Sequence, residues 1–147
     1  MSNGTILIVD DEANLRSTMA AILERAGYSV STASDASQAL QSLNEQPYDL
    51  LFLDLRMPDV DGMEALPQIH SRWPDLPILI LTAVISLDTA SQAMDLGARG
   101  YLLKPVDPEL ILKRVAGIIE EQRYNKLCQE ISQEIQELFM QMRLIGT

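Results

Sequence analysis

Acidic side chains follow two apolar runs in this 147-residue chain. Asp54 comes directly after residues 50–53, and the pair Asp10 and Asp11 comes directly after residues 5–9. Four successive apolar residues predict a strand that is buried on both faces, and such a strand tolerates a carboxylate only at its open end. A single aspartate after a strand often does no more than begin a turn. Whether Asp54 has a chemical role therefore depends on which residues lie near it.

Two further apolar runs also end in polar side chains. Residues 77–81 are followed by Thr82, and residues 100–103 are followed by Lys104. In a parallel α/β sheet the ligand site lies outside the carboxyl ends of the strands, which meet at one edge. We therefore expect one group of side chains to converge there, namely Asp10, Asp11, Asp54, Thr82 and Lys104.

This group of side chains suggests phosphoryl chemistry. Carboxylates held close together repel one another unless a cation lies between them, and oxygen ligands without a nearby His or Cys favour Mg²⁺. A carboxylate oxygen of Asp54 could then attack a phosphoryl group. Lys104 would supply a positive charge to one phosphoryl oxygen, and the Thr82 hydroxyl could donate a hydrogen bond to another. Taken singly, each residue has an ordinary structural explanation, but together they predict an aspartyl-phosphate site.

The elements that must position these residues alternate along the chain. Strands are predicted at residues 5–9, 29–33, 49–53, 77–81 and 100–103, and helical apolar spacing separates them. Asp35, Ser86 and Asp107 are predicted helix caps, and a helix over residues 62–73 contains Pro67. Five strands that alternate with five helices imply right-handed crossovers and an α/β fold, with a doubly wound parallel sheet covered on both faces.

Other helical positions are predicted to face the core. In the fourth helix these are Ala90, Ala93, Met94 and Leu96, and in the fifth they are Leu110, Ile111, Val115, Ile118 and Ile119. No glycine or proline interrupts residues 118–145, so the fifth helix is predicted to continue past the compact domain. We expect a domain at residues 1–123 and a helical extension at residues 124–147.

The extension has an apolar pattern of its own, a heptad seam about three repeats long. Its members are spaced alternately by four and three residues: Tyr124, Cys128, Ile131, Ile135, Leu138, Met142 and Ile145. The simplest partner for this seam is the same seam on a second copy, which predicts a homodimer through a coiled coil or a helix bundle. The alternative is that the tail folds back on its own domain. The positions that flank the seam carry a single charge, Glu134, which cannot specify the orientation of a dimer.

Composition excludes several other classes of protein. The chain has 11 Lys+Arg against 21 Asp+Glu, a net charge of −10, so no general attraction to nucleic acid or anionic lipid is expected. The absence of an 18-residue apolar segment predicts no membrane span, and the lone Cys128 fits a reducing compartment. A P-loop motif is also absent. We expect a soluble cytoplasmic protein that does not itself bind nucleic acid or membrane.

The motifs at the strand ends resemble the receiver domain of bacterial two-component response regulators. They are Asp10-Asp11, Asp54-x-x-Met57-Pro58, Thr82-Ala83 and Lys104-Pro105, and the resemblance covers residues 4–123. It implies the flavodoxin-like strand order 2-1-3-4-5. It also implies a phosphoacceptor signalling protein rather than an enzyme with an external substrate.

The resemblance further implies a role for each residue at the predicted site. Asp54 would accept phosphate from the phosphohistidine of a histidine kinase or a phosphotransfer protein, in a reaction that depends on Mg²⁺. Asp11, Asp54 and the backbone carbonyl of Arg56 would bind the ion directly, and Asp10 would bind it through water.

Lys104 would pair with the phosphoryl group, and the Lys104–Pro105 peptide bond would be cis. Thr82 and Tyr101 would form a switch pair, in which the hydroxyl moves to the phosphate and the aromatic ring swings inward. The signal would leave through the fourth helix, the fifth strand and the fifth helix.

Other functions remain open at this stage. One alternative is a stand-alone receiver that docks on a partner protein or relays phosphate. A hydrolase with an aspartyl nucleophile is a weaker alternative, because such enzymes use Asp-x-Asp after the first strand and this chain has Glu12 at the second position. Residues 143–147 resemble the approach to the ATPase module of enhancer-binding activators, which favours a receiver and linker from a larger regulator. The kinase, the stimulus and the output are not specified.

Overall fold

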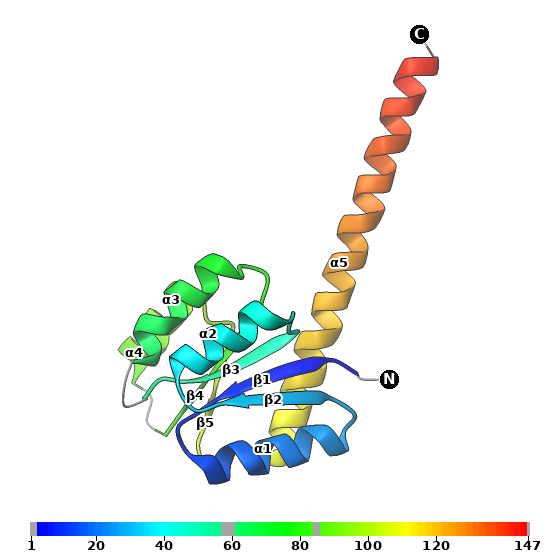
Figure 1. Cartoon of the computed structure of the whole chain (residues 1–147). Coiled ribbons are helices and arrows are strands. Elements are labelled where there is room, and N and C mark those ends of the chain that lie inside the picture. The colour runs from blue at the N-terminus through cyan, green and yellow to red at the C-terminus, as the bar shows by residue number, and fades with distance from the viewer. Residues whose placement is uncertain (1–2, 57–60, 84–85, 147) are drawn as a thin grey trace.

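Five parallel strands form one sheet, with helices on both of its faces, in the computed structural model, which describes residues 3–56, 61–83 and 86–146 (Figure 1). The strand order is β2-β1-β3-β4-β5, so both the predicted α/β class and the predicted order are confirmed. The strands are β1 Thr5–Val9, β2 Ser29–Ala33, β3 Leu50–Asp54, β4 Ile78–Thr82 and β5 Gly100–Leu103. The helices are α1 Ala13–Arg25, α2 Ala36–Glu45, α3 Gly62–Arg72, α4 Leu87–Asp95 and α5 Pro108–Ile145.

Two apolar cores lie on opposite faces of the sheet. Helices α2, α3 and α4 pack on one face, and α1 and α5 pack on the other (Figure 1). Because both faces are covered, every residue of β3 and of β4 is buried. The edge strand β2 has only Ala33 buried. The two central strands β3 and β4 are therefore the most deeply enclosed part of the fold, and both end at the predicted site.

Strands β3 and β4 each run one residue further than their apolar patterns predict. Asp54 pairs with Leu81 in the ladder, and the backbone N–H of Lys104 donates to the carbonyl of Thr82 at 2.8 Å. The continued pairing holds the polar residues in extended backbone, whereas apolar content alone ends each strand earlier. Asp54 and Thr82 are consequently the last residues of their strands, with positions set by the sheet rather than by a loop.

The predicted helix caps are confirmed. The side chains of Asp35, Ser86 and Asp107 accept hydrogen bonds from the backbone N–H groups at the starts of α2, α4 and α5. Helix α3 includes Pro67 and ends at Arg72, one residue before the predicted end. Each cap satisfies a donor that the first turn of a helix leaves without a partner.

Two apolar residues that were predicted to face the core are exposed. Met94 on α4 is 49% exposed and Leu110 on α5 is 43% exposed. Both lie near β5, one of the two edge strands of the described sheet, so the apolar surface there is larger than the sequence pattern predicts. The other predicted core positions of α5 are buried: Ile111, Val115, Ile118 and Ile119.

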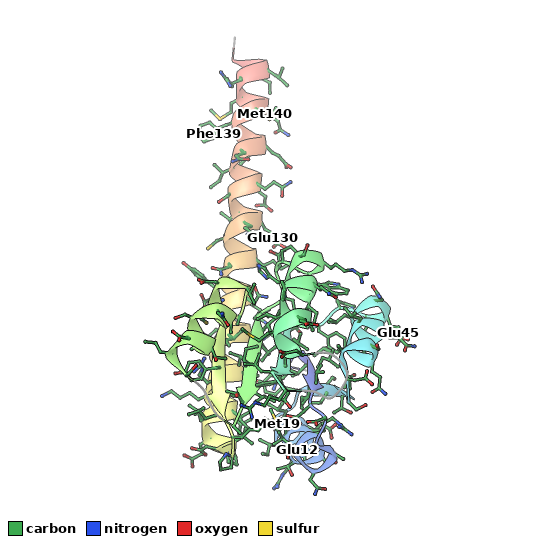
Figure 2. All side chains as sticks on the ribbon, turned by 90° about the vertical axis from the view of Figure 1, so that its left-hand side faces the viewer. Glu12, Met19, Glu45, Glu130, Phe139 and Met140 are labelled. Atoms are coloured by element: carbon green, nitrogen blue, oxygen red, sulfur yellow. The ribbon has the colours of Figure 1, made fainter. Side chains whose placement is uncertain are left out.

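Helix α5 is continuous for 38 residues and leaves the body of the molecule as a straight rod (Figure 1). Residues 123–146 are all exposed, and the side chains of Phe139 and Met140 stand clear of the body (Figure 2). The tail does not fold back on its own domain. Among the described residues, no helix combines the length and the apolar character needed to cross a bilayer.

Candidate functional site

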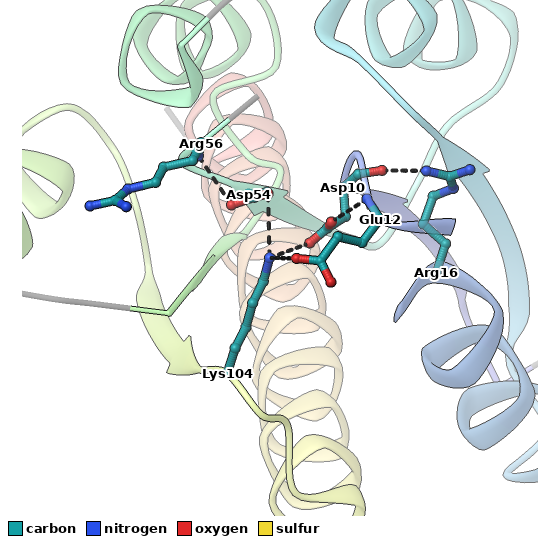
Figure 3. A network of polar contacts seen from close by, with 6 residues as sticks. All are labelled: Asp10, Glu12, Arg16, Asp54, Arg56 and Lys104. Carbon is teal, nitrogen blue, oxygen red and sulfur yellow. Dashed lines mark hydrogen bonds and ion pairs between the residues drawn. The ribbon is translucent and has the colours of Figure 1, made fainter. Parts of the chain in front are cut away.

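Asp54 lies at the carboxyl edge of the sheet, at the end of the buried strand β3. The residue is 3% exposed. Its Oδ1 accepts a hydrogen bond from the backbone N–H of Arg56 at 3.1 Å, and its Oδ2 lies 3.4 Å from Lys104 Nζ (Figure 3). The turn after the strand therefore fixes one carboxylate oxygen, and the other oxygen faces a cation.

Lys104 follows β5 and reaches across the edge of the sheet. Its Nζ lies 2.8 Å from Asp10 Oδ2, 3.4 Å from Asp54 Oδ2 and 3.6 Å from Glu12 Oε1 (Figure 3). The lysine side chain is only 13% exposed. A single ammonium group thus faces three carboxylates, and it cannot neutralise them all.

Asp10, directly after β1, is fully buried. Its backbone N–H donates to the carbonyl of Ala33 at 3.1 Å, and its Oδ1 accepts the backbone N–H of Glu12 at 2.8 Å. Arg16 donates to the Asp10 carbonyl at 2.6 Å (Figure 3). Within the described chain, the buried Oδ2 accepts no well-directed hydrogen bond and has only its ion pair with Lys104. Such an oxygen is suited to bind a cation, directly or through water.

The acidic cluster is wider than the sequence pattern predicts. Carboxylate oxygens of Asp10, Asp11 and Glu12 lie within 4.8 Å of one another. Asp11 and Glu12 are exposed, so the cluster opens to solvent on one side. Oxygen ligands with an open side fit Mg²⁺, which keeps several of its waters. Asp54 is joined to this cluster through Lys104.

Burial raises the pKa of Asp54 to about 6, from an ordinary value of 3.8. The hydrogen bond from Arg56 and the charge of Lys104 lower this pKa, and the nearby carboxylate of Asp10 raises it. Burial lowers the pKa of Lys104, but its contacts with Asp10 and Asp54 outweigh burial and leave the pKa above its ordinary value. At neutral pH the lysine is therefore charged, and Asp54 is ionised at a free-energy cost.

Comparisons with known proteins identify the family of this domain. The family model described as "Response regulator receiver domain" matches residues 6–116, which is most of the chain. This chain belongs to the response regulator receiver family. Members of that family are phosphoacceptor signalling domains and bind Mg²⁺ at an acidic cluster. In this receiver the candidate cluster contains Asp10, Asp11 and Glu12.

The receiver is similar to parts of longer transcriptional regulators. The alginate biosynthesis transcriptional regulatory protein AlgB of Pseudomonas aeruginosa is 39% identical over 132 residues, which cover 90% of this chain and 29% of AlgB. The transcriptional regulatory protein ZraR of Escherichia coli is 41% identical over 105 residues, covering 71% of this chain and 24% of ZraR. The chain thus spans less than a third of the length of these curated relatives.

Solved structures show the same fold. A CheY-like receiver domain protein from Methanospirillum hungatei superposes with a TM-score of 0.79 at 30% identity, covering 82% of this chain and 97% of that chain. NtrX from Brucella abortus superposes with a TM-score of 0.83 at 28% identity, covering 89% of this chain and 30% of that chain. The second match covers more of the present chain than the first.

The remaining predicted site residues lie on β4 and β5 and directly after β3 and β5. Thr82 is buried at the end of β4, whereas Tyr101 on β5 is 42% exposed and pairs with Ile80 in the ladder. The Lys104–Pro105 peptide bond is cis. The Arg56 side chain extends away from Asp54 (Figure 3). The motif residues Met57 and Pro58 lie outside the described residues.

Two residues that contact the site, Glu12 and Arg16, are not among its predicted members. Glu12 directly follows the Asp10-Asp11 pair, so adjacency was an available signal, but acidic residues after a strand are ordinary in a turn. Arg16 acts through its contact with a backbone carbonyl, which leaves no recognisable sequence motif.

Proposed function

We propose that this chain is the phosphoacceptor receiver of a response regulator and that Asp54 is the residue that accepts phosphate. The observation that carries the proposal is the position of the Asp54 carboxylate. It is buried, one of its oxygens is fixed by the Arg56 N–H, and the other faces Lys104 at 3.4 Å. A carboxylate held in this way is oriented for in-line attack before the donor arrives.

The proposed donor is the phosphohistidine of a histidine kinase or a phosphotransfer protein. The Asp54 oxygen that faces Lys104 forms a bond to phosphorus while the bond between phosphorus and the imidazole nitrogen breaks. The leaving imidazole nitrogen takes up a proton. Lys104 exchanges part of its contact with Asp54 for a phosphoryl oxygen, and the Thr82 hydroxyl donates to another phosphoryl oxygen.

The acidic residues would hold Mg²⁺ during this transfer. Asp11, Asp54 and the Arg56 carbonyl are the proposed direct ligands, with Asp10 acting through water. The buried Asp10 Oδ2 and the 4.8 Å grouping of Asp10 with Asp11 and Glu12 support this assignment. The ion supplies positive charge for the phosphoryl oxygens. Turnover of an external substrate is not part of the proposed function.

Phosphorylation would be sensed at β4 and β5. The Thr82 hydroxyl would move toward the phosphate, and the ring of Tyr101, now 42% exposed, would turn inward. Their strands are neighbours in the sheet, which supports a coupled movement. The change would reach α5 and its tail, a proposed dimerisation and signal-transmission segment at residues 124–147.

The output proposed for this receiver is the control of transcription. The relatives named AlgB and ZraR are described as transcriptional regulatory proteins, and the AlgB match covers 90% of this chain. In this proposal the receiver body would take up phosphate, and the tail would pass the change to an output module in the same or another chain. A stand-alone receiver that relays phosphate is the alternative.

The decisive experiment incubates wild type, Asp54→Asn and Asp95→Asn with Mg²⁺ and acetyl phosphate and measures phosphoryl incorporation by intact mass. Asp95 is an exposed aspartate at the end of α4 and serves as the matched control. Wild type and Asp95→Asn should both be labelled, and Asp54→Asn should not. Equal labelling of Asp54→Asn would overturn the proposal, as would a complete lack of labelling of the folded wild type.

A further inference from the structure

The turn that contains Asp10 and Asp11 is held by a residue of the helix that follows it. Arg16 lies near the start of α1, and its Nη1 donates to the carbonyl oxygen of Asp10 at 2.6 Å (Figure 3). The backbone N–H of the same arginine donates to the carbonyl of Glu12 at 3.1 Å. Arg16 therefore contacts both the first and the last residue of the turn between β1 and α1.

The polar groups of Asp10 other than Oδ2 each have a well-directed hydrogen bond. The backbone N–H donates to the carbonyl of Ala33 at 3.1 Å, Oδ1 accepts the N–H of Glu12 at 2.8 Å, and the carbonyl accepts the guanidinium of Arg16. These contacts come from three places, namely the end of β2, the turn itself and α1. Oδ2 is left facing Lys104 Nζ at 2.8 Å. The oxygen that suits a cation is thus placed by hydrogen bonds made elsewhere in the same residue.

The contact from Arg16 satisfies an oxygen that lies beyond the described strand ladder. The paired residues of β1 end at Val9, one residue before Asp10. Asp10 is fully buried, so water does not reach its carbonyl in place of the guanidinium. A charged donor makes a stronger hydrogen bond than a neutral one, and its removal would leave a buried acceptor unsatisfied. Loss of the guanidinium would therefore favour rotation of this carbonyl toward solvent, and the carboxylate would move with it.

The charge of Arg16 by itself would work against a bound cation. Carboxylate oxygens of Asp10, Asp11 and Glu12 lie within 4.8 Å of one another, and a positive charge near them repels Mg²⁺. The guanidinium contact is made to a backbone carbonyl, so it uses no carboxylate oxygen that a metal could bind. The position and the charge of this arginine thus have opposite effects on metal affinity, and the sign of the change in a variant shows which effect is larger.

We propose that Arg16 is a positioning residue for the metal site. It fixes the turn after β1 so that Asp10 Oδ2 is directed at the ion, which Asp10 contacts through water, and it thereby raises the affinity for Mg²⁺. Arg16 touches neither the ion nor the phosphoryl group. The inference rests on the proposed function, because it adds a residue to the same Asp54 site. Replacing an outer residue that orients metal ligands typically lowers metal affinity by about 10–100-fold.

A magnesium titration of the full chain, followed by amide chemical shifts in NMR spectra, tests this role. Arg16→Met removes the donor and the charge, and Arg25→Met removes an exposed charge at the other end of α1 as the matched control. Arg16→Met should raise the Kd for Mg²⁺ at least about tenfold, and Arg25→Met should change it by less than about twofold. An unchanged or lower Kd in folded Arg16→Met would overturn the proposal, because only the charge effect would remain.

Hydrogen exchange without divalent cations tests the turn directly. Arg16→Gln keeps a polar side chain and is the second variant, for use in both measurements if Arg16→Met does not fold. Exchange at the Glu12 amide, which donates to Asp10 Oδ1, should be at least about tenfold faster in Arg16→Gln than in wild type. The Gln38 amide, which donates to Asp35 Oδ1 at 2.8 Å, is the control and should not change. Equal exchange at Glu12 would show that the turn does not depend on Arg16, which also overturns the proposal.

Acetyl phosphate labelling separates this inference from the proposed function. In Arg16→Met the Mg²⁺ concentration for half-maximal labelling of Asp54 should rise about tenfold, whereas the rate at saturating Mg²⁺ should change by less than about twofold. A lower saturating rate with an unchanged Mg²⁺ dependence would assign Arg16 to the transfer step and contradict the proposal. If folded wild type binds Mg²⁺ but is not labelled, the proposed function is wrong, and the titration still tests Arg16. A wild type that binds no Mg²⁺ would overturn both.

Discussion

The carboxyl edge of the sheet and the helical tail differ in what they bury and what they expose. At the carboxyl edge of the sheet, charged groups are buried among apolar strands and must neutralise one another, as Asp10, Asp54 and Lys104 do. Along the tail, apolar side chains are exposed, with Leu138 at 58% and Ile145 at 85%. The site at the sheet edge contains more negative charge than Lys104 can neutralise, and the tail exposes apolar side chains along its whole length. The two ends therefore differ in kind: one has uncompensated buried charge and the other has uncovered apolar surface.

The largest expected effect is at the buried end. Lys104→Met should lower the free energy of unfolding by about 3–5 kcal/mol at neutral pH without divalent cations, because it leaves Asp10 and Asp54 buried without their cation. Lys126→Met, which removes an exposed lysine from the tail, is the control and should change stability by less than about 0.5 kcal/mol. Urea unfolding followed by circular dichroism measures both. Equal stabilities would show that the lysine is not needed to compensate the carboxylates.

The next effect is at the exposed end. Replacing both Ile131 and Ile135 by glutamate should weaken self-association by at least about a hundredfold, because charges would replace apolar contacts in adjacent layers of the seam. Sedimentation equilibrium measures the change, and the pair Gln129→Glu and Gln133→Glu adds the same charge off the seam as a control. Acetyl phosphate labelling of Asp54 should be unchanged. If the two double variants associate equally, the exposed stripe is not a pairing surface.

The cost of burying Asp54 should show in the pH dependence of stability. Its pKa is about 6 in the folded protein and 3.8 ordinarily, so between these values the folded state binds the extra proton. Protonation of Asp54 therefore contributes to the free energy of unfolding below pH 4, and this contribution is lost as the pH rises through 6. Asp54→Asn, which resembles the protonated acid, should be more stable than wild type by about 1–3 kcal/mol at pH 7 in a chelator.

Thermal unfolding at a series of pH values measures this difference. The stability gap between Asp54→Asn and wild type should close below pH 4, and saturating Mg²⁺ should narrow it at pH 7 by stabilising wild type more. Asp95→Asn, which removes an exposed carboxylate, should show neither trend. A gap that is independent of pH would mean that burial does not penalise the ionised form of Asp54.

The smallest expected effect concerns the start of the helix that joins the two ends. Asp107 caps α5 by accepting the backbone N–H of Glu109 at 3.1 Å. Asp107→Ala should cost about 1 kcal/mol of unfolding free energy in chemical denaturation. Glu137→Ala, on the exposed tail, should cost less than about 0.5 kcal/mol. A larger loss at Glu137 than at Asp107 would mean that the stability of α5 depends on the tail rather than on its packing against the sheet.

Local patterns were sufficient for most of the fold. Apolar runs located five strands, helical spacing located five helices, and Asp35, Ser86 and Asp107 were identified as caps because a cap acts on residues only two or three positions away. The predicted strand bounds and buried positions were wrong where they depend on a segment that is distant in the sequence. Strands β3 and β4 begin and end one residue later than predicted because partner strands set the ladder, and Met94 and Leu110 are exposed near β5, an edge strand of the described sheet.

The sequence by itself determined which residue types end the strands, and hence that carboxylates, a hydroxyl and a lysine would meet at one edge of a parallel sheet. Only the tertiary structure decided how they meet. Lys104 lies closer to Asp10 than to Asp54 and also contacts Glu12, because these distances depend on how the strands pack. Arg16 contacts the Asp10 carbonyl because α1 begins directly after the turn that follows β1. The direction of the tail is decided in the same way. Heptad spacing predicts a seam, but packing of Ile111 and Val115 on the sheet turns that seam away from the body.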